Sequence, residues 1–311
     1  MQTVTIYDEL HDPEVRLSRD LRDAARTLTE AEARYLVDYY YQLQGDRIRA
    51  GNRSFALTES GEPHTVIAWL GQRTSTLELQ IKRALDAYSD GHPVGQWARS
   101  IVGIGPVIAS GLLSHIDITK APTAGHIWRF AGLDPTVSWG KKEKRPWNAR
   151  LKTLCWKIGE SFVKVSGHER DVYGKLYLQR KAREIEFNLR GEYAEQAVAA
   201  LAAKRLGDDT DARAWYEGRF SAETARTFWT TEGTKRAAVL KAGRGEVESG
   251  VRMLPPARLH LRAQRWAVKL FLAHYQAVAY RTHFGVDAPK PYAMTQAGGH
   301  AHEIVCPNWP F

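Results

Sequence analysis

Residues 97–113 read WARSIVGIGPVIASGLL, and this stretch decides how the chain is expected to fold. An apolar run leads into Gly103-Ile104-Gly105, and a second apolar run follows Pro106. Glycines permit a tight turn and a close approach of the backbone, and proline is favoured at the first position of a helix. The pattern therefore predicts two short helices joined by a Gly-x-Gly turn, which is the helix-hairpin-helix motif.

This motif carries a simple binding chemistry. The N–H groups of the turn, and of the helix that follows it, point outward and can hold a phosphate. Such contacts position a protein on nucleic acid without reading its sequence. We therefore expect backbone-phosphate contacts at Gly103, Ile104, Gly105 and Val107. The alternative is a plain turn between two helices that pack in a core.

Positive charge is concentrated in two parts of the chain. The 311 residues carry a formal net charge of +9. Residues 140–190 hold fourteen Lys and Arg against six Asp and Glu, and residues 251–290 hold seven against one. Two segments of this kind favour a surface that binds a polyanion, with ordinary solvated helix faces as the alternative.

Cysteine content and hydropathy indicate the compartment. Two cysteines, Cys155 and Cys306, exclude a disulfide framework and fit a reducing environment. The first residues do not read as a signal peptide. No run of about 18 apolar residues is present, so no membrane span is expected. These features predict a cytoplasmic protein.

Helical periodicity dominates the chain and no alternation of period two persists, so the sequence predicts an all-α fold. Thr29 and Glu32 have the spacing of a capping box, at the start of a helix that we expect to end at Ile48, before a loop at Gly51. A second helix is expected over residues 65–88. The two should form an antiparallel, coiled-coil-like pair, which could also join two copies of the chain into a homodimer.

A basic loop is expected over residues 138–147, which read SWGKKEKRPW. Cations interleaved with tryptophans suit phosphate contact combined with base stacking, although the tryptophans could instead anchor the loop to the body. The candidate contacts in the loop and at the start of the following helix are Lys141, Lys142, Lys144, Arg145 and Arg150. That helix is expected over about residues 148–164, and its inward-facing apolar residues are Leu151, Leu154, Cys155, Ile158 and Phe162.

A late helix opens at Pro255-Pro256 and is predicted to present a basic ridge. The four cations of this ridge recur at i, i+4, i+7 and i+11, so they lie on one helix face that can follow phosphates. They are Arg258, Arg262, Arg265 and Lys269. The buried stripe of the same helix is expected to contain Leu259, Ala263, Trp266, Leu270 and Ala273.

The sequence divides into four expected regions. Residues 1–93 form the helical pair, and residues 94–165 form a helical core that contains the hairpin. Residues 166–250 read as a polar helical insertion, and residues 251–311 as the basic helix and a tail.

The tail contains His300, His302 and Cys306, which are residue types that bind zinc. Their spacing matches no standard site, so we predict neither a metal site nor a cofactor.

Three features together resemble a known family. The Gly103–Pro106 turn, the Phe130–Pro135 stretch (FAGLDP) and the basic loop resemble the C-terminal transposase domain of the bridge-RNA-guided insertion-sequence transposases, over about residues 94–165. Those proteins pair an acidic nuclease domain with a serine nucleophile. The resemblance implies DNA strand transfer and places the serine at Ser138.

The remainder of the chain departs from that family. The family begins with a strand-rich domain that carries acidic metal ligands, whereas the first 93 residues here read as helices. The closing basic helix resembles actinobacterial or phage relatives. We therefore favour a non-catalytic, transposase-like protein of a mobile element or phage that holds DNA or structured RNA. The alternatives are a serine recombinase completed by a partner's acidic domain and a phage scaffold that binds a protein.

Overall fold

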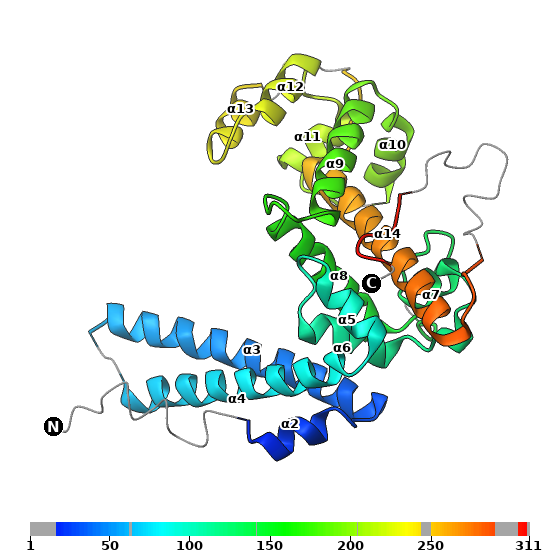
Figure 1. Ribbon diagram of the computed structural model, residues 1–311. Coiled ribbons are helices and arrows are strands. Elements are labelled where there is room, and N and C mark those ends of the chain that lie inside the picture. The colour runs from blue at the N-terminus through cyan, green and yellow to red at the C-terminus, as the bar shows by residue number, and fades with distance from the viewer. Residues whose placement is uncertain are drawn as a thin grey trace. The chain divides into compact units, whose positions relative to one another are not determined.

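The computed structural model describes residues 17–61, 64–140, 142–203, 205–243, 250–289 and 304–309. Within these ranges every regular element is a helix, which confirms the all-α prediction (Figure 1). The chain forms two compact units: unit 1 comprises residues 1–161 and 269–311, and unit 2 comprises residues 162–268. The four-region division stays a prediction.

Unit 1 begins with α2 (Arg19–Ala25), α3 (Glu30–Glu59) and α4 (Thr65–Asp90). Helices α3 and α4 lie side by side and run antiparallel, which confirms the predicted pair (Figure 1). The Glu32 N–H donates to the Thr29 hydroxyl at 3.3 Å, and the Thr29 N–H donates to the Glu32 carboxylate at 2.8 Å. The capping box expected at the start of α3 is therefore formed.

The end of α3 differs from the prediction, because the helix continues past Ile48 to Glu59. The loop expected at Gly51 is wrong. Gly51 is exposed and has no neighbouring atom that a side chain would meet within 4 Å. A glycine inside an exposed helix costs only about 1 kcal/mol, so a long helix that is packed elsewhere can contain one.

Two short helices, α5 (Pro93–Ser100) and α6 (Pro106–His115), are joined by a turn over residues 101–105. Gly103 has φ +97°, a conformation that glycine adopts without a steric penalty. Pro106 is the first residue of α6, as predicted. The α5 residue Trp97 is fully buried and stacks on Phe271 with ring centroids 5.8 Å apart, which fixes α5 in the core of unit 1.

The 3-10 helix η1 (Ile118–Lys120), α7 (Ala124–Phe130) and α8 (Ala149–Lys164) follow. Thr123 directly precedes α7, and its hydroxyl contacts His126 Nδ1 at 2.9 Å and makes no hydrogen bond to the helix backbone. Gly132, with φ +65°, follows the end of α7. The predicted inner face of α8 is buried: Leu151, Leu154, Cys155, Ile158 and Phe162.

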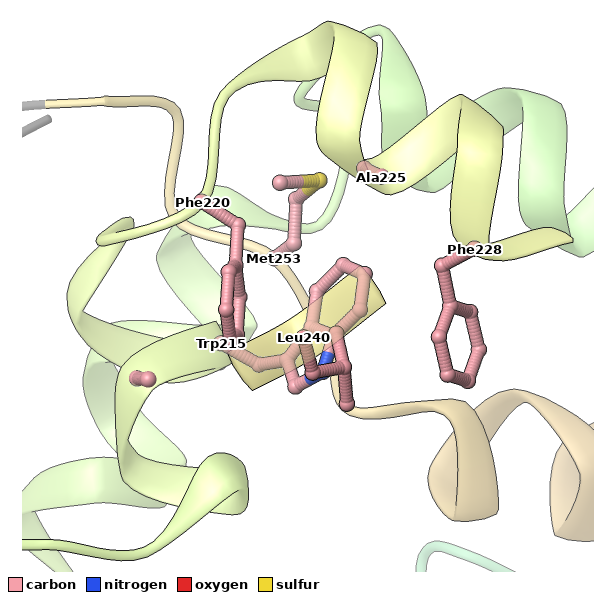
Figure 2. Packing of buried hydrophobic residues seen from close by; sticks show 7 residues of the cluster. Trp215, Phe220, Ala225, Phe228, Leu240 and Met253 are labelled. Atoms are coloured by element: carbon pink, nitrogen blue, oxygen red, sulfur yellow. The ribbon is translucent and has the colours of Figure 1, made fainter. Parts of the chain in front are cut away.

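Unit 2 contains α9 (Tyr173–Leu189), α10 (Ala194–Ala202), α11 (Asp211–Glu217), α12 (Ala222–Thr230), α13 (Lys235–Gly243) and the first part of α14 (Pro256–Phe284). Trp215 packs between Phe220 and Phe228, with ring centroids 5.0 and 5.6 Å away (Figure 2). Ala225, Leu240 and Met253 complete this buried cluster with Ala214. The segment expected to be a polar insertion thus contains an apolar core.

The buried stripe of α14 is only partly as predicted. Leu259 and Ala263 are fully buried, but the stripe then continues through Ala267, Phe271 and Tyr275. Trp266, Leu270 and Ala273 are only partly buried. The repeat of three to four residues holds, because Val268, Leu272 and Val278 are buried as well, but after Ala263 the stripe is shifted by one position from the predicted one. No helix in the described ranges is both long and apolar enough to span a membrane.

Candidate nucleic-acid interface

The turn between α5 and α6 is held from inside unit 1 by two hydrogen bonds. The Ile104 N–H donates to the Ile101 carbonyl at 2.9 Å, and the Ser161 hydroxyl of α8 donates to the Gly103 carbonyl at 2.5 Å. The N–H groups of Gly103 and Gly105 have no acceptor among the described residues. The turn is therefore held by hydrogen bonds to its carbonyl groups, while the N–H groups of its two glycines are available to a ligand.

The four residues predicted to contact phosphate in this turn differ in what they can offer. The side chains of Ile104 and Val107 are 4% and 6% exposed, and the Ile104 N–H is already used. Val107 packs with Val37 and Leu85, so only its backbone N–H remains for a ligand. Gly105 has an ordinary φ of −92° and open space where a Cβ would lie. Because Gly105 has no side chain, the N–H groups at the start of α6 stay accessible.

The basic loop is anchored by its second tryptophan. A Cβ placed on Gly132 would lie 2.7 Å from the Trp147 ring, so the indole packs directly on this bare backbone. Trp139 meets Trp147 in an edge-to-face arrangement with centroids 5.9 Å apart, and its indole N–H donates to the Glu143 carbonyl at 2.7 Å. The anchoring role considered for the tryptophans is thus present in the structure.

Cations of this region lie over the tryptophan faces. The Arg145 guanidinium carbon is 5.2 Å from the centre of the Trp139 ring, and Lys152 Nζ is 4.1 Å from that of Trp147. Cation–π contacts of this kind order long side chains without neutralising their charge. Lys142, Lys144 and Arg145 are exposed and form no ion pair with the carboxylates that the structure describes.

The two remaining predicted phosphate contacts of this region are Arg150 and Lys141. Arg150 is mostly exposed but forms an ion pair with Asp38 of α3, so part of its charge is balanced within unit 1. Lys141 lies outside the described residues.

The arginine ridge of α14 is not one uniform surface. Within unit 2, Arg262 Nε donates to the carboxylate of Glu184 at 2.8 Å, and the Arg262 guanidinium carbon lies 4.4 Å from the centre of the Tyr193 ring. The Tyr193 hydroxyl donates to the same carboxylate oxygen, Oε2, at 2.6 Å, and Arg180 binds the other oxygen, Oε1, at 2.6 Å. The Glu184 side chain is only 1% exposed. Arg262 is therefore engaged inside the protein.

The protonation of Glu184 reflects these partners. Burial alone would raise its pKa, but hydrogen bonds from Tyr193 and Arg262, together with the charges of Arg262 and Arg180, outweigh burial and hold the pKa below its usual value. Glu184 is accordingly a charged group at neutral pH, compensated by two arginines.

The other three residues of the ridge have different surroundings. Arg258 and Arg265 are exposed, and Lys269 Nζ lies 4.2 Å from the Trp128 ring centre.

The structure describes the catalytic candidate and one of the three residues considered for a metal. Ser138 is exposed in the basic loop. No group of three or more His, Cys, Asp or Glu side chains that could hold a metal ion occurs in the described part of the chain. His300 and His302 lie outside the described residues, and Cys306 is a partly buried free thiol.

Helix α8 separates the two predicted contact regions of unit 1. Asn148 caps the start of α8 by accepting the N–H of Leu151 at 3.0 Å, and Ser161 lies thirteen residues further along. At 1.5 Å per residue, the loop end and the turn end of the helix are about 20 Å apart. The structure thus joins them through one rigid element but does not bring them into one pocket.

Sequence reasoning missed one residue at this interface. Trp156 is 54% exposed on α8, four residues after Lys152 and on the same helix face. Its signal was available, because a tryptophan lies there among polar positions and opposite the predicted apolar stripe.

A comparison with known protein families finds one match. Residues 96–171 are similar to a transposase segment, and this range contains the turn, the basic loop and all of α8. The matching family is described as the transposase IS116/IS110/IS902 family. The similarity to a transposase predicted from the sequence is confirmed over this range. No match was found among curated proteins or among solved structures.

Proposed function

We propose that the protein is a transposase-like nucleic-acid-binding protein that holds the phosphate backbone through the α5–α6 turn and the basic loop. The observation that carries this proposal is the group of exposed cations over anchored tryptophans at residues 139–152. It lies inside the segment that is similar to transposases. In this proposal the α5–α6 turn acts as a helix-hairpin-helix motif, and the turn and the basic loop bind the same ligand. The ligand is DNA or structured RNA.

The arrangement favours nucleic acid over an acidic protein for a physical reason. Anchored indoles beside exposed cations suit a ligand that has flat bases and regularly spaced phosphates. Unpartnered N–H groups at the start of a helix suit a phosphate oxygen. Both features lie on unit 1, so this unit alone can contact one ligand at two places.

The test is fluorescence anisotropy with a labelled duplex, a branched DNA and a structured RNA over a series of salt concentrations. We expect tight binding at low salt that weakens steeply as salt rises, because phosphate contacts release counterions. Neutralising Lys144 and Arg145 together, as Lys144→Gln and Arg145→Gln, should lower the salt slope by about 1 for each phosphate contact that is lost.

The matched control is Arg19→Gln, because Arg19 is a highly exposed cation on α2 with a side chain 94% exposed. This variant should bind like the wild type. Flat binding curves at low salt for all three ligands would overturn the proposal and favour the protein-scaffold alternative.

A second function, serine-dependent strand transfer, is favoured by one observation: Ser138 is exposed within the matched segment. A serine nucleophile needs a base to take its proton and a charge to stabilise the leaving group. In this proposal an acidic partner domain supplies those groups. Ser138→Ala should then abolish DNA cleavage in the presence of that partner and leave binding unchanged, whereas equal cleavage by both proteins would exclude Ser138 as the nucleophile.

We also propose that the α3–α4 pair joins two copies of the chain. Phe55 is 68% exposed and Trp69 is 55% exposed, and both are large apolar side chains on this pair. Light scattering coupled to size-exclusion chromatography measures the mass directly. A monomer at all concentrations would exclude the homodimer.

A further inference from the structure

A surface hollow of about 310 Å³ lies beside the basic loop in unit 1. Its lining residues are Arg145, Trp147, Ala149, Lys152, Thr153 and Trp156. The four that belong to α8 fall at i, i+3, i+4 and i+7, so they share one helix face, opposite the buried face of that helix. The loop residues Arg145 and Trp147 close the hollow near the start of α8. The sequence-derived site residues did not include Trp156 or this hollow.

Trp156 supplies an open aromatic surface in the hollow. Its side chain is 54% exposed, and its ring stacks on no other ring in the described ranges. The other large aromatic of the hollow, Trp147, is fixed by its packing on Gly132 and by the edge of Trp139. One wall of the hollow is therefore rigid before any ligand arrives, which reduces the ordering cost of binding.

Positive charge surrounds this aromatic hollow. Lys152 and Arg145 both line it, and each already lies over an indole face, at 4.1 and 5.2 Å from the ring centres. A ligand that matches these features has a flat face that stacks and a negative charge directly beside it. A nucleotide within a strand has both, since every base has a stacking face and every base is joined to phosphates.

The ligand must also have an unpaired base. In a duplex each base is stacked on both faces by its neighbours, so it cannot enter a side pocket without leaving the stack. We propose that this hollow binds an unpaired base of a single strand, which stacks on Trp156 while Lys152 and Arg145 contact the adjoining phosphates. This inference rests on the proposed nucleic-acid binding and adds to it a preference for unpaired over paired strands.

The experiment compares two single strands with equal charge. One is an oligothymidylate of about twelve nucleotides, within the usual site size of single-strand binders, and the other is an abasic strand of the same length. Both offer the same phosphates, so a difference in affinity measures the bases alone. We expect the full-length protein to bind the oligothymidylate about tenfold more tightly, given the usual strength of one base–aromatic stack.

The variant Trp156→Ala assigns that difference to the hollow. We expect it to lose most of the tenfold preference and to bind the abasic strand as the wild type does. Trp156→Phe should keep part of the preference, because phenylalanine retains a stacking face. The control is Phe284→Ala, which removes another exposed aromatic side chain, 45% exposed, at the end of α14. Circular dichroism confirms that each variant is folded.

A second readout follows stacking directly. The fluorescence of 2-aminopurine in a single strand falls when the base stacks, so wild-type protein should quench it and Trp156→Ala should not.

Each outcome has a distinct meaning. Equal affinity of the wild type for the two strands would overturn the inference and leave phosphate binding in place. A base preference that survives Trp156→Ala would overturn the assignment to this hollow. Failure to bind duplex, abasic strand and oligothymidylate alike would overturn the proposed function itself.

Discussion

The cations of the basic loop and Arg262 of α14 look equivalent in the sequence but have different surroundings in the structure. In the loop, Lys144 and Arg145 are exposed and have no carboxylate partner among the residues described. In unit 2, Arg262 is bound to Glu184, a carboxylate that is almost completely buried. A basic residue is available to a ligand only where the fold has not already used its charge.

The largest effect that would test this contrast is expected from Glu184→Gln. The substitution leaves Arg180 and Arg262 without their shared counter-charge in a buried position. We expect it to lower the free energy of unfolding by about 3–5 kcal/mol, as measured by chemical denaturation.

Glu186→Gln is the matched control, because Glu186 lies two residues away on the same helix and is exposed. It should change the stability by no more than about 0.5 kcal/mol. Similar effects of the two variants would show that Glu184 is not a compensated buried charge.

Acid should weaken unit 2 through the same carboxylate. The folded-state pKa of Glu184 lies below the ordinary value of 4.5, so its contribution to stability is fully present above that pH. The contribution is lost as the pH falls below about 4.5 and through the folded-state pKa. Denaturation midpoints across this range should therefore fall more steeply for the wild type than for Glu184→Gln. An equal fall of the denaturation midpoint with pH in the two proteins would show that Glu184 does not carry this acid sensitivity.

A smaller effect should separate two arginines of the ridge. The sequence predicts that charge reversal at Arg262 and Arg265 weakens binding, but at Arg262 this would place a second carboxylate beside Glu184 and disturb the fold. The milder Arg262→Gln should cost about 1–3 kcal/mol of stability. Arg265→Gln should change stability by less than about 0.5 kcal/mol and, if the ridge follows phosphates, lower the salt slope of binding by about 1. Equal losses of stability in Arg262→Gln and Arg265→Gln would show that Arg262 is no more engaged in the fold than Arg265.

A last pair of modest effects concerns the two glycines of the α5–α6 turn. Gly103→Ala should destabilise the protein by about 1–2 kcal/mol, because alanine is strained at positive φ. Gly105→Ala meets no atom within 4 Å and should fold normally. Its methyl group would cover the start of α6 and weaken binding by about two- to tenfold, the loss of roughly one hydrogen bond. Unchanged affinity in the anisotropy assay would exclude this turn as a phosphate site.

Much of the helical fold could be predicted because its signals are local. The capping box of Thr29 and Glu32, the proline at the start of α6 and the apolar face of α8 each depend on residues within a few positions of one another. The extension of α3 through Gly51 could not be predicted in this way. Tertiary packing elsewhere along a long helix outweighs the small intrinsic cost of one glycine.

The candidate site was predicted less completely, since its properties depend on contacts between distant residues. Arg262 meets Glu184 across 78 positions of sequence, and no local pattern reveals that pair. The apolar core around Trp215 combines residues from three helices and two loops that are separated by polar stretches. Trp156 was overlooked for a different reason, since its helix face is visible in the sequence but its hollow is completed by the loop.

The capped helix α8 also has a consequence for the size of the ligand. It holds the basic loop and the α5–α6 turn about 20 Å apart, and the backbone of one strand of a B-form duplex advances about 3.4 Å per nucleotide. A fragment shorter than about six nucleotides can therefore reach only one end of the helix at a time. Under the proposed function, affinity is therefore expected to rise abruptly as a duplex grows past this length, because only a longer duplex reaches both ends of α8.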